Sequence, residues 1–148
     1  MYLPYRASIK LDLKTFSDTW GIKANTAEVA YIHPIDDHWM MDFKIRHYTQ
    51  SKANFFSDLF SRIDAQNFLA RDKEMSGFTN NSIGIGASYK KEFKDSEIFD
   101  RYSVNLSLDF MQFDYDDFRD LRVDAEVGTE PFYNFNATVV RLYFSIFY

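Results

Sequence analysis

The clearest signal in the sequence is an alternation of apolar and polar residues with a period of two. In residues 5–14, Arg, Ser, Lys and Asp side chains separate the apolar positions Tyr5, Ala7, Ile9, Leu11 and Leu13. Successive side chains of a β-strand point to opposite faces of the sheet, so this segment predicts a strand with one apolar and one charged face.

The same alternation recurs in five further segments, at residues 25–31, 39–50, 82–93, 102–111 and 140–148. Strands of about ten residues cross a bilayer when they are tilted. The sequence therefore predicts an all-β fold: the antiparallel, up-and-down portion of a transmembrane β-barrel, with about six strands here. A water-soluble sheet also alternates, with its apolar face turned onto a core, and remains the alternative.

Aromatic residues and loop lengths give this predicted barrel an orientation. The apolar face ends in Tyr or Trp at one rim, as expected of an interfacial girdle. The predicted membrane-interface residues are Tyr5, Tyr31, Trp39, Tyr89, Tyr102 and Tyr148. Connections at this rim are short, at residues 34–38 and 94–100, whereas residues 51–81 and 114–136 form long connections at the other rim. Short periplasmic turns and long outer loops are typical of outer-membrane barrels, which places the C-terminus in the periplasm.

One of the long connections is expected to contain a short helix. Phe56, Leu59, Phe60 and Ile63 have the spacing of one helix face. The helix either packs on the barrel rim or plugs the interior.

The polar face is the best functional lead. Its charged residues are predicted to face the lumen, and basic groups outnumber acidic ones: Arg6, Lys10, Asp12, Lys14, Glu28, Asp42, Lys44, Arg46, Lys90, Asp109 and Arg141. In a narrow barrel they would pair and fill the interior, whereas in a wide one they would line a pore that favours anionic solutes. Gly84 and Gly86 lie on the same face and are expected to make room for a bulky neighbour, a loop or a plug.

Composition excludes several kinds of chemistry. The chain has 148 residues, a net charge of −5 and no cysteine, so thiolate sites are absent and nucleic acid is not expected as a partner. Two further segments carry groups that bind metals. His33 to His38 combines two histidines with two aspartates, and the acidic stretch comprises Asp114, Asp116, Asp117, Asp120, Asp124, Glu126 and Glu130. A polar turn and a solvated loop explain them, so neither a metal nor a cofactor is predicted.

Three segments carry a family resemblance: residues 18–22 (DTWGI), 46–50 (RHYTQ) and 71–76 (RDKEMS). With the terminal RLYFSIFY, they resemble the C-terminal half of an uncharacterised family of bacterial outer-membrane β-barrels, and the similarity covers most of residues 15–95. Genes of that family tend to lie beside a thioredoxin-like protein, a small lipoprotein and a periplasmic flavin transferase. The resemblance implies a barrel in the Gram-negative outer membrane, and it implies no established activity.

These observations lead to two functional hypotheses. The first is a non-enzymatic outer-membrane barrel, with no catalytic residues, that acts as a channel or as a scaffold for an envelope system. Its expected partners are outer-membrane lipid, lipopolysaccharide and the barrel-assembly machinery, and the resemblance adds periplasmic redox proteins. The second is a soluble β-barrel that binds an apolar ligand. Because single-chain barrels begin at eight strands, residues 1–148 are expected to form one unit of a larger barrel.

Overall fold

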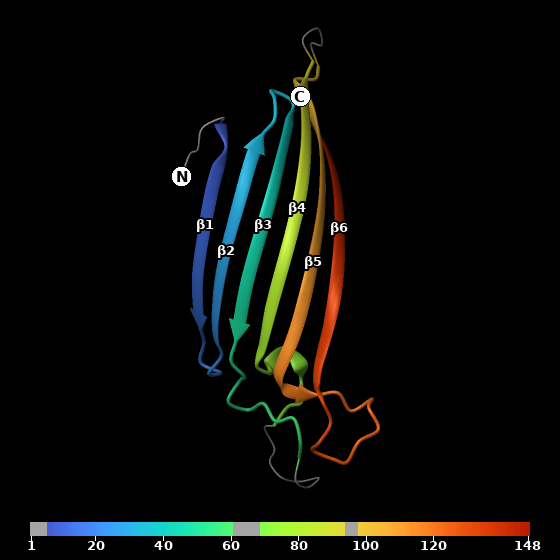
Figure 1. Cartoon of the computed structure of the whole chain (residues 1–148). Helices are drawn as coiled ribbons and strands as arrows, with labels where there is room; N and C mark the ends of the chain where they lie inside the picture. The colour runs from blue at the N-terminus through green and yellow to red at the C-terminus, as the bar shows by residue number, and fades with distance from the viewer. Residues whose placement is uncertain (1–5, 61–68, 94–97) are drawn as a thin grey trace.

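A single antiparallel sheet dominates the computed structural model, which describes residues 6–60, 69–93 and 98–148. The strands follow one another in the sheet in chain order, as Figure 1 shows. Their bounds are β1 (Ser8–Ser17), β2 (Lys23–Pro34), β3 (Trp39–Gln50), β4 (Phe78–Glu92), β5 (Arg101–Arg119) and β6 (Phe132–Phe147). The predicted all-β, up-and-down arrangement of six strands is confirmed.

Strands β4, β5 and β6 are longer than the alternation predicts, and they lengthen at the rim opposite the C-terminus. β4 begins at Phe78, β5 continues to Arg119 and β6 begins at Phe132. The connections at this rim are therefore residues 18–22, 51–77 and 120–131, so about half of the predicted 114–136 loop is strand. The predicted strands end too early because, in these extensions, polar residues occupy the face that is apolar in the rest of each strand, as described below.

The predicted helix in the 51–81 connection is not present in its described part. Phe56 forms an isolated bridge with Ala70, and Leu59 and Phe60 have no helical structure; Ile63 lies outside the described residues. A short 3-10 helix, η2 (Lys73–Met75), occurs later in the same connection, with the Asp72 side chain accepting a hydrogen bond from the Glu74 backbone N–H. The bridge between Phe56 and Ala70 takes the place of a helical turn, and tertiary pairing therefore overrides the local spacing.

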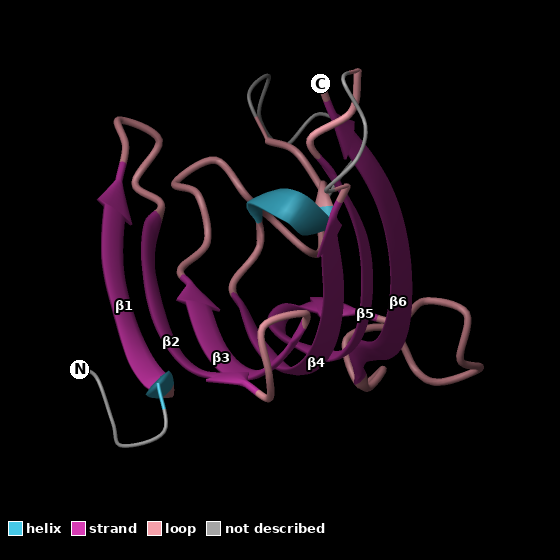
Figure 2. Cartoon of the chain, turned by 90° about the horizontal axis from the view of Figure 1, so that it is seen from above, coloured by secondary structure: helices cyan, strands magenta, loops and turns pink. Residues whose placement is uncertain are grey.

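The sheet is strongly curved and forms a trough, with β1 and β6 as its two walls (Figure 2). The described part of the 51–77 connection, with η2, lies at one end of the trough on its concave side (Figures 1 and 2). Gln50 of β3 shows which side chains face this way, because its Nε2 donates hydrogen bonds to the backbone oxygens of Glu74 (2.8 Å) and Ser76 (3.1 Å). Residues that alternate in step with Gln50 therefore form the concave face, and the others form the convex face.

The trough has two free edges. β1 pairs only with β2, and β6 pairs only with β5, within the described part of the chain. The sheet is therefore open. None of the helices among the described residues combines the length and the apolar character that a membrane crossing requires.

A small apolar cluster joins the connections at the long-loop rim. Ile22, Ala53 and Phe56 are buried together, and Phe55 and Met75 pack against them. The backbone binds across the same contact, since Ala53 N–H donates to Met75 O (2.8 Å) and Asn54 N–H donates to Trp20 O (2.8 Å). This cluster anchors the 51–77 connection beside the β1–β2 turn.

The β2–β3 turn generates a first prediction. Asp36 Oδ1 accepts hydrogen bonds from the backbone N–H groups of His38 (2.7 Å) and Trp39 (2.6 Å), and these bonds lower the pKa of Asp36 below its ordinary value of 3.8. A lowered pKa means that the ionised Asp36 stabilises the fold above that ordinary value and that this stabilisation is lost as the pH falls through the lowered pKa. NMR titration should show the depressed midpoint.

Two substitutions check the cause. Asp36→Ala should lower the thermal midpoint at neutral pH, whereas Asp36→Asn should retain most of the stability because an amide oxygen still accepts both bonds. Asp37→Ala is the matched control, since Asp37 only forms an exposed ion pair with Arg6 (3.0 Å). Equal losses for the alanine variants at positions 36 and 37 would contradict the prediction.

Candidate functional site

The convex face carries a continuous apolar band. The strand register aligns its residues in rows that run across the whole sheet. Two of these rows are Leu11–Val29–Ile45–Ile83–Phe110–Thr138 and Ile9–Tyr31–Phe43–Ile85–Leu108–Val140. These side chains are exposed, with Leu142 at 69% in the neighbouring row, so the sheet presents its apolar surface outward.

The band ends at polar rows toward the long loops. In the first row, His47, Asn81, Gln112 and Asn136 are polar on β3 to β6, with His47 Nδ1 2.7 Å from Asn81 Oδ1, whereas Leu13 and Ala27 on β1 and β2 are still apolar. The next is polar on every strand: Thr15–Asn25–Thr49–Thr79–Asp114–Asn134. From Tyr102 to Gln112 the distance along β5 is about 33 Å at ~3.3 Å per residue. A strand tilted by ~40°, as in outer-membrane barrels, would convert this length into a height of about 25 Å along the barrel axis. That height matches the apolar band of such barrels.

The other limit of the band is aromatic. Trp39 contacts Tyr89 (centroids 4.9 Å apart), and Tyr89 contacts Tyr102 (6.0 Å). Tyr31 lies two rows further into the band, beside Phe43, and Tyr148 lies beyond Ile146. The aromatic line thus runs obliquely across the strands, as it must if the strands are tilted. Tyr5, also predicted for this girdle, lies outside the described residues.

The centre of the concave face is a cross-strand charge bridge. Lys44 of β3, Gly84 of β4 and Asp109 of β5 are directly opposite one another in the register. Lys44 Nζ lies 2.8 Å from Asp109 Oδ1, and Arg141 of β6 binds Asp109 Oδ2. The Asp109 side chain is only 2% exposed, so both cations neutralise a buried carboxylate.

Glycine at position 84 makes this bridge possible. The side chains of Lys44 and Asp109 meet above β4, and a Cβ atom at position 84 would overlap both of them. Gly86 has the same relation to Asp42, whose carboxylate occupies the space where a Cβ would lie. The sequence had predicted that these glycines make room for a neighbour, and the neighbours are charged side chains.

The other residues predicted for the lumen are spread over the same face, with one exception. Lys10, Asp12, Lys14, Glu28, Asp42, Arg46 and Lys90 all alternate in step with Lys44 and Gly84. Asp12 lies within 3.7 Å of Lys10 Nζ and 3.1 Å of Lys14 Nζ, an ion-paired run along β1. Arg6 is the exception, because it precedes β1 and pairs with Asp37 in the β2–β3 turn.

Toward the long loops the concave face becomes aromatic, which the sequence interpretation missed. Phe113 and Phe135 stack in parallel (4.5 Å, 4°), and Phe78 contacts Phe113 (6.2 Å) and Tyr115 (5.3 Å). The cluster also includes Tyr48 and Tyr133. Beyond the apolar band, toward the long loops, the polarity of the sheet is thus inverted, with aromatic residues on the concave face and polar residues on the convex face. Continuing the strand parity past residue 111 would have revealed it.

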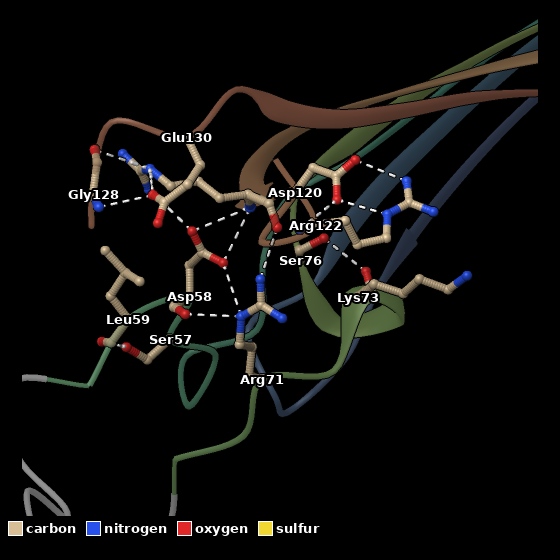
Figure 3. Close-up of polar contacts among 11 residues, drawn as sticks. Ser57, Asp58, Leu59, Arg71, Lys73, Ser76, Asp120, Arg122, Gly128 and Glu130 are labelled. Atoms are coloured by element: carbon tan, nitrogen blue, oxygen red, sulfur yellow. Dashed lines mark hydrogen bonds and ion pairs between the residues drawn. The ribbon is translucent and has the colours of Figure 1, made fainter. Parts of the chain in front are cut away.

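A buried carboxylate fastens the long connections to this rim. Asp58 accepts hydrogen bonds from Arg71 Nε (3.2 Å), Arg119 Nη1 (3.0 Å) and the Arg119 backbone N–H (3.1 Å). Glu130 accepts from the Gly128 backbone N–H (2.7 Å), and Figure 3 shows it beside the Asp58 network. The 51–77 and 120–131 connections are therefore tied to each other at the end of β5.

The two candidate metal segments are arranged differently from a metal site. His33 Nδ1 lies 2.9 Å from Tyr31 Oη, His38 stacks on Tyr89, and Asp36 is occupied by the turn. In the acidic stretch, Asp117 pairs with Lys52 (3.2 Å) and Asp120 with Arg122 (2.7 Å). Across residues 6–60, 69–93 and 98–148, no group of three or more His, Asp or Glu side chains has the geometry to hold a metal ion.

The charge bridge generates the second prediction. Asp109→Asn should lower the free energy of unfolding by about 2 kcal/mol or more, approaching the 3–5 kcal/mol of a fully buried pair, because two cations lose their counterion. Asp114→Asn is the matched control, since Asp114 lies on the polar convex row of the same strand. Denaturant unfolding of both variants measures the difference, and similar values for the two would show that the bridge is not stabilising.

Comparison with known proteins gives one family match. No curated protein and no solved structure matches the chain. A family model described as "Protein of unknown function (DUF3570)" matches residues 1–110, which include β1 to β4 and the half of β5 that carries Asp109. The outer-membrane location and the gene neighbours implied by the resemblance stay predictions. The match covers most of the chain, which therefore belongs to the uncharacterised DUF3570 family.

Proposed function

We propose that the chain forms part of a non-enzymatic β-barrel of the bacterial outer membrane, with the concave face lining a hydrated lumen. The observation that carries this proposal is the placement of the apolar band. It lies on the convex side, runs across all six strands, and is bounded by aromatic residues at one end and polar rows at the other. Lipid is the environment that matches an exposed band of this height.

The curvature of the sheet weighs against the soluble alternative. A soluble barrel that binds an apolar ligand needs its apolar face inside, on the concave side. Here the concave side carries Lys44, Asp109 and Arg141, and above them an aromatic cluster that is already packed against itself. The open edges of β1 and β6 add a requirement: in lipid their backbone groups must pair with further strands, from the same polypeptide or from another copy.

The charge bridge bears on the choice between a channel and a filled interior. Lys44 and Asp109 meet directly above Gly84, so this pair runs along the wall from β3 to β5. Cross-strand pairing of this kind is expected of a narrow interior filled by charge pairs, and a channel requires in addition a width that leaves the centre hydrated. A role as a scaffold for periplasmic redox proteins is a further hypothesis, and it rests on the family resemblance.

Cell fractionation tests the proposal. The protein expressed from its native gene should sediment with outer membranes, resist extraction by carbonate, and require detergent to stay in solution. A protein that stayed soluble without detergent and fractionated with the periplasm would overturn the proposal.

A matched pair of substitutions tests the position of the band. Leu108→Arg places a charge near its centre and should lower the free energy of unfolding in bilayers by about 2–4 kcal/mol, whereas Thr79→Arg, on the fully polar row of the same face, should cost about 0–1 kcal/mol. Denaturant titration in lipid vesicles measures both. Equal costs would show that the convex face does not contact lipid where we place it.

A further inference from the structure

A small pocket opens at the long-loop rim, apart from the charge bridge. It has a volume of about 300 Å³, at the lower end of the range for small-molecule sites. Its lining combines cations with aromatic rings: Arg71, Lys73, Phe118, Arg119, Arg122 and Tyr133. Four parts of the chain supply them, namely the connection around η2, the end of β5, the 120–131 connection and the start of β6.

The pocket lies on the lumen side of the rim. Tyr133 belongs to the concave aromatic cluster, 5.7 Å from Phe135. Lys73 Nζ lies 5.6 Å from the centroid of Phe135, so the connection that carries η2 covers the same cluster. In the barrel that we propose, a ligand in this pocket would sit at the mouth of the lumen.

The lining of the pocket is basic, although the arginines behind it are paired with carboxylates. The carboxylates that hold Arg71 and Arg119 are Asp58 and Glu130, whose side chains are 8% and 5% exposed, so the guanidinium groups are the more accessible members of these pairs. Among the described lining residues, Asp120 is the one carboxylate, against four cations; Glu74, outside the lining, lies 3.9 Å from Lys73 Nζ. Asp120 is bound by Arg122 through Nε (2.8 Å) and Nη2 (2.7 Å).

The guanidinium group of Arg71 is held firmly and still has N–H donors to offer. Arg71 uses Nε to bind Asp58 and Nη2 to bind Arg119 O (2.7 Å), and its Cζ lies 4.1 Å from the centroid of Phe118. An arginine side chain carries five N–H donors, so these bonds orient the group without exhausting it. Pre-positioned guanidinium groups bind phosphate and carboxylate oxygens well, because little side-chain entropy is lost on binding.

We propose that this pocket binds a phosphorylated solute at the mouth of the lumen, with the phosphate held by Lys73, Arg122 and the remaining N–H donors of Arg71. The location of the pocket on the concave side favours a free solute. The phosphorylated core of lipopolysaccharide carries the same chemistry and is the second source to test. The position at a lumen mouth rests on the proposed function, whereas the pocket itself does not depend on it.

Calorimetric titration of the full chain in detergent micelles tests the site with glucose 6-phosphate, and with glucose as the uncharged probe. Glucose 6-phosphate should bind and glucose should not bind measurably. Lys73→Gln and Arg122→Gln should each weaken binding about tenfold, the usual effect of losing one charged hydrogen bond. Lys52→Gln is the matched control, because Lys52 is an exposed lysine of the same rim, paired with Asp117 and outside the pocket.

The outcomes separate the alternatives. Displacement of glucose 6-phosphate by purified lipopolysaccharide would support the site and assign it to lipid-borne phosphate, and binding without displacement would support a free solute. Absence of binding, equal binding of glucose, or equal weakening by Lys52→Gln would overturn the proposal. If the chain fractionated as a soluble periplasmic protein but bound glucose 6-phosphate with the expected variant pattern, the membrane function would fail and the site would stand.

Discussion

The antiparallel register from β1 to β6 is the constraint on which the other features depend. Each strand is paired residue by residue with the next, and the irregularity recorded in the last pair lies between Asp114 and Arg119, beyond the band. Because the register does not shift within the band, apolar side chains from six separate strands align in continuous rows across the sheet, and so do the polar ones. A shift of one residue in any pair would move a whole strand's apolar set to the concave side. The register therefore decides both where the apolar band lies and which charges meet.

The sequence predicts the strands well where the two faces differ in polarity. The bounds of β3, Trp39–Gln50, agree with the alternation, because apolar and charged residues separate cleanly along its length. The prediction fails at the ends of β4, β5 and β6, where Phe78, Phe113 and Phe135 occupy the concave face. The period of two continues there, but its sense is inverted, and a search for one constant apolar face stops at the inversion.

The candidate site could be predicted only as a set of residues. Parity places Lys44, Asp109 and Arg141 on one face, but their pairing depends on the register, which no local pattern in the sequence specifies. The aromatic and arginine network at the rim was missed for a related reason. Asp58, Arg71 and Arg119 lie far apart in the chain, and only the folded connections bring them together. The acidic stretch likewise looked like a free negative loop until its lysine and arginine partners were in place.

The strands differ in how far they reach beyond the band, and this gives the trough walls of unequal height. The row that contains Ala24, Gln50, Phe78 and Tyr115 is nearly the last for β1 and β2, whereas β5 continues to Arg119, about 13 Å further at ~3.3 Å per residue. The high side carries the folded connections and the basic pocket, and the low side ends in the short β1–β2 turn. The two flanks are not independent, because the 51–77 connection contacts both: Ala53 and Phe56 pack on Ile22 beside the β1–β2 turn, and Asp58 is bonded to Arg119 at the end of β5. The connection therefore works as a brace that holds the short flank and the tall flank at a fixed separation.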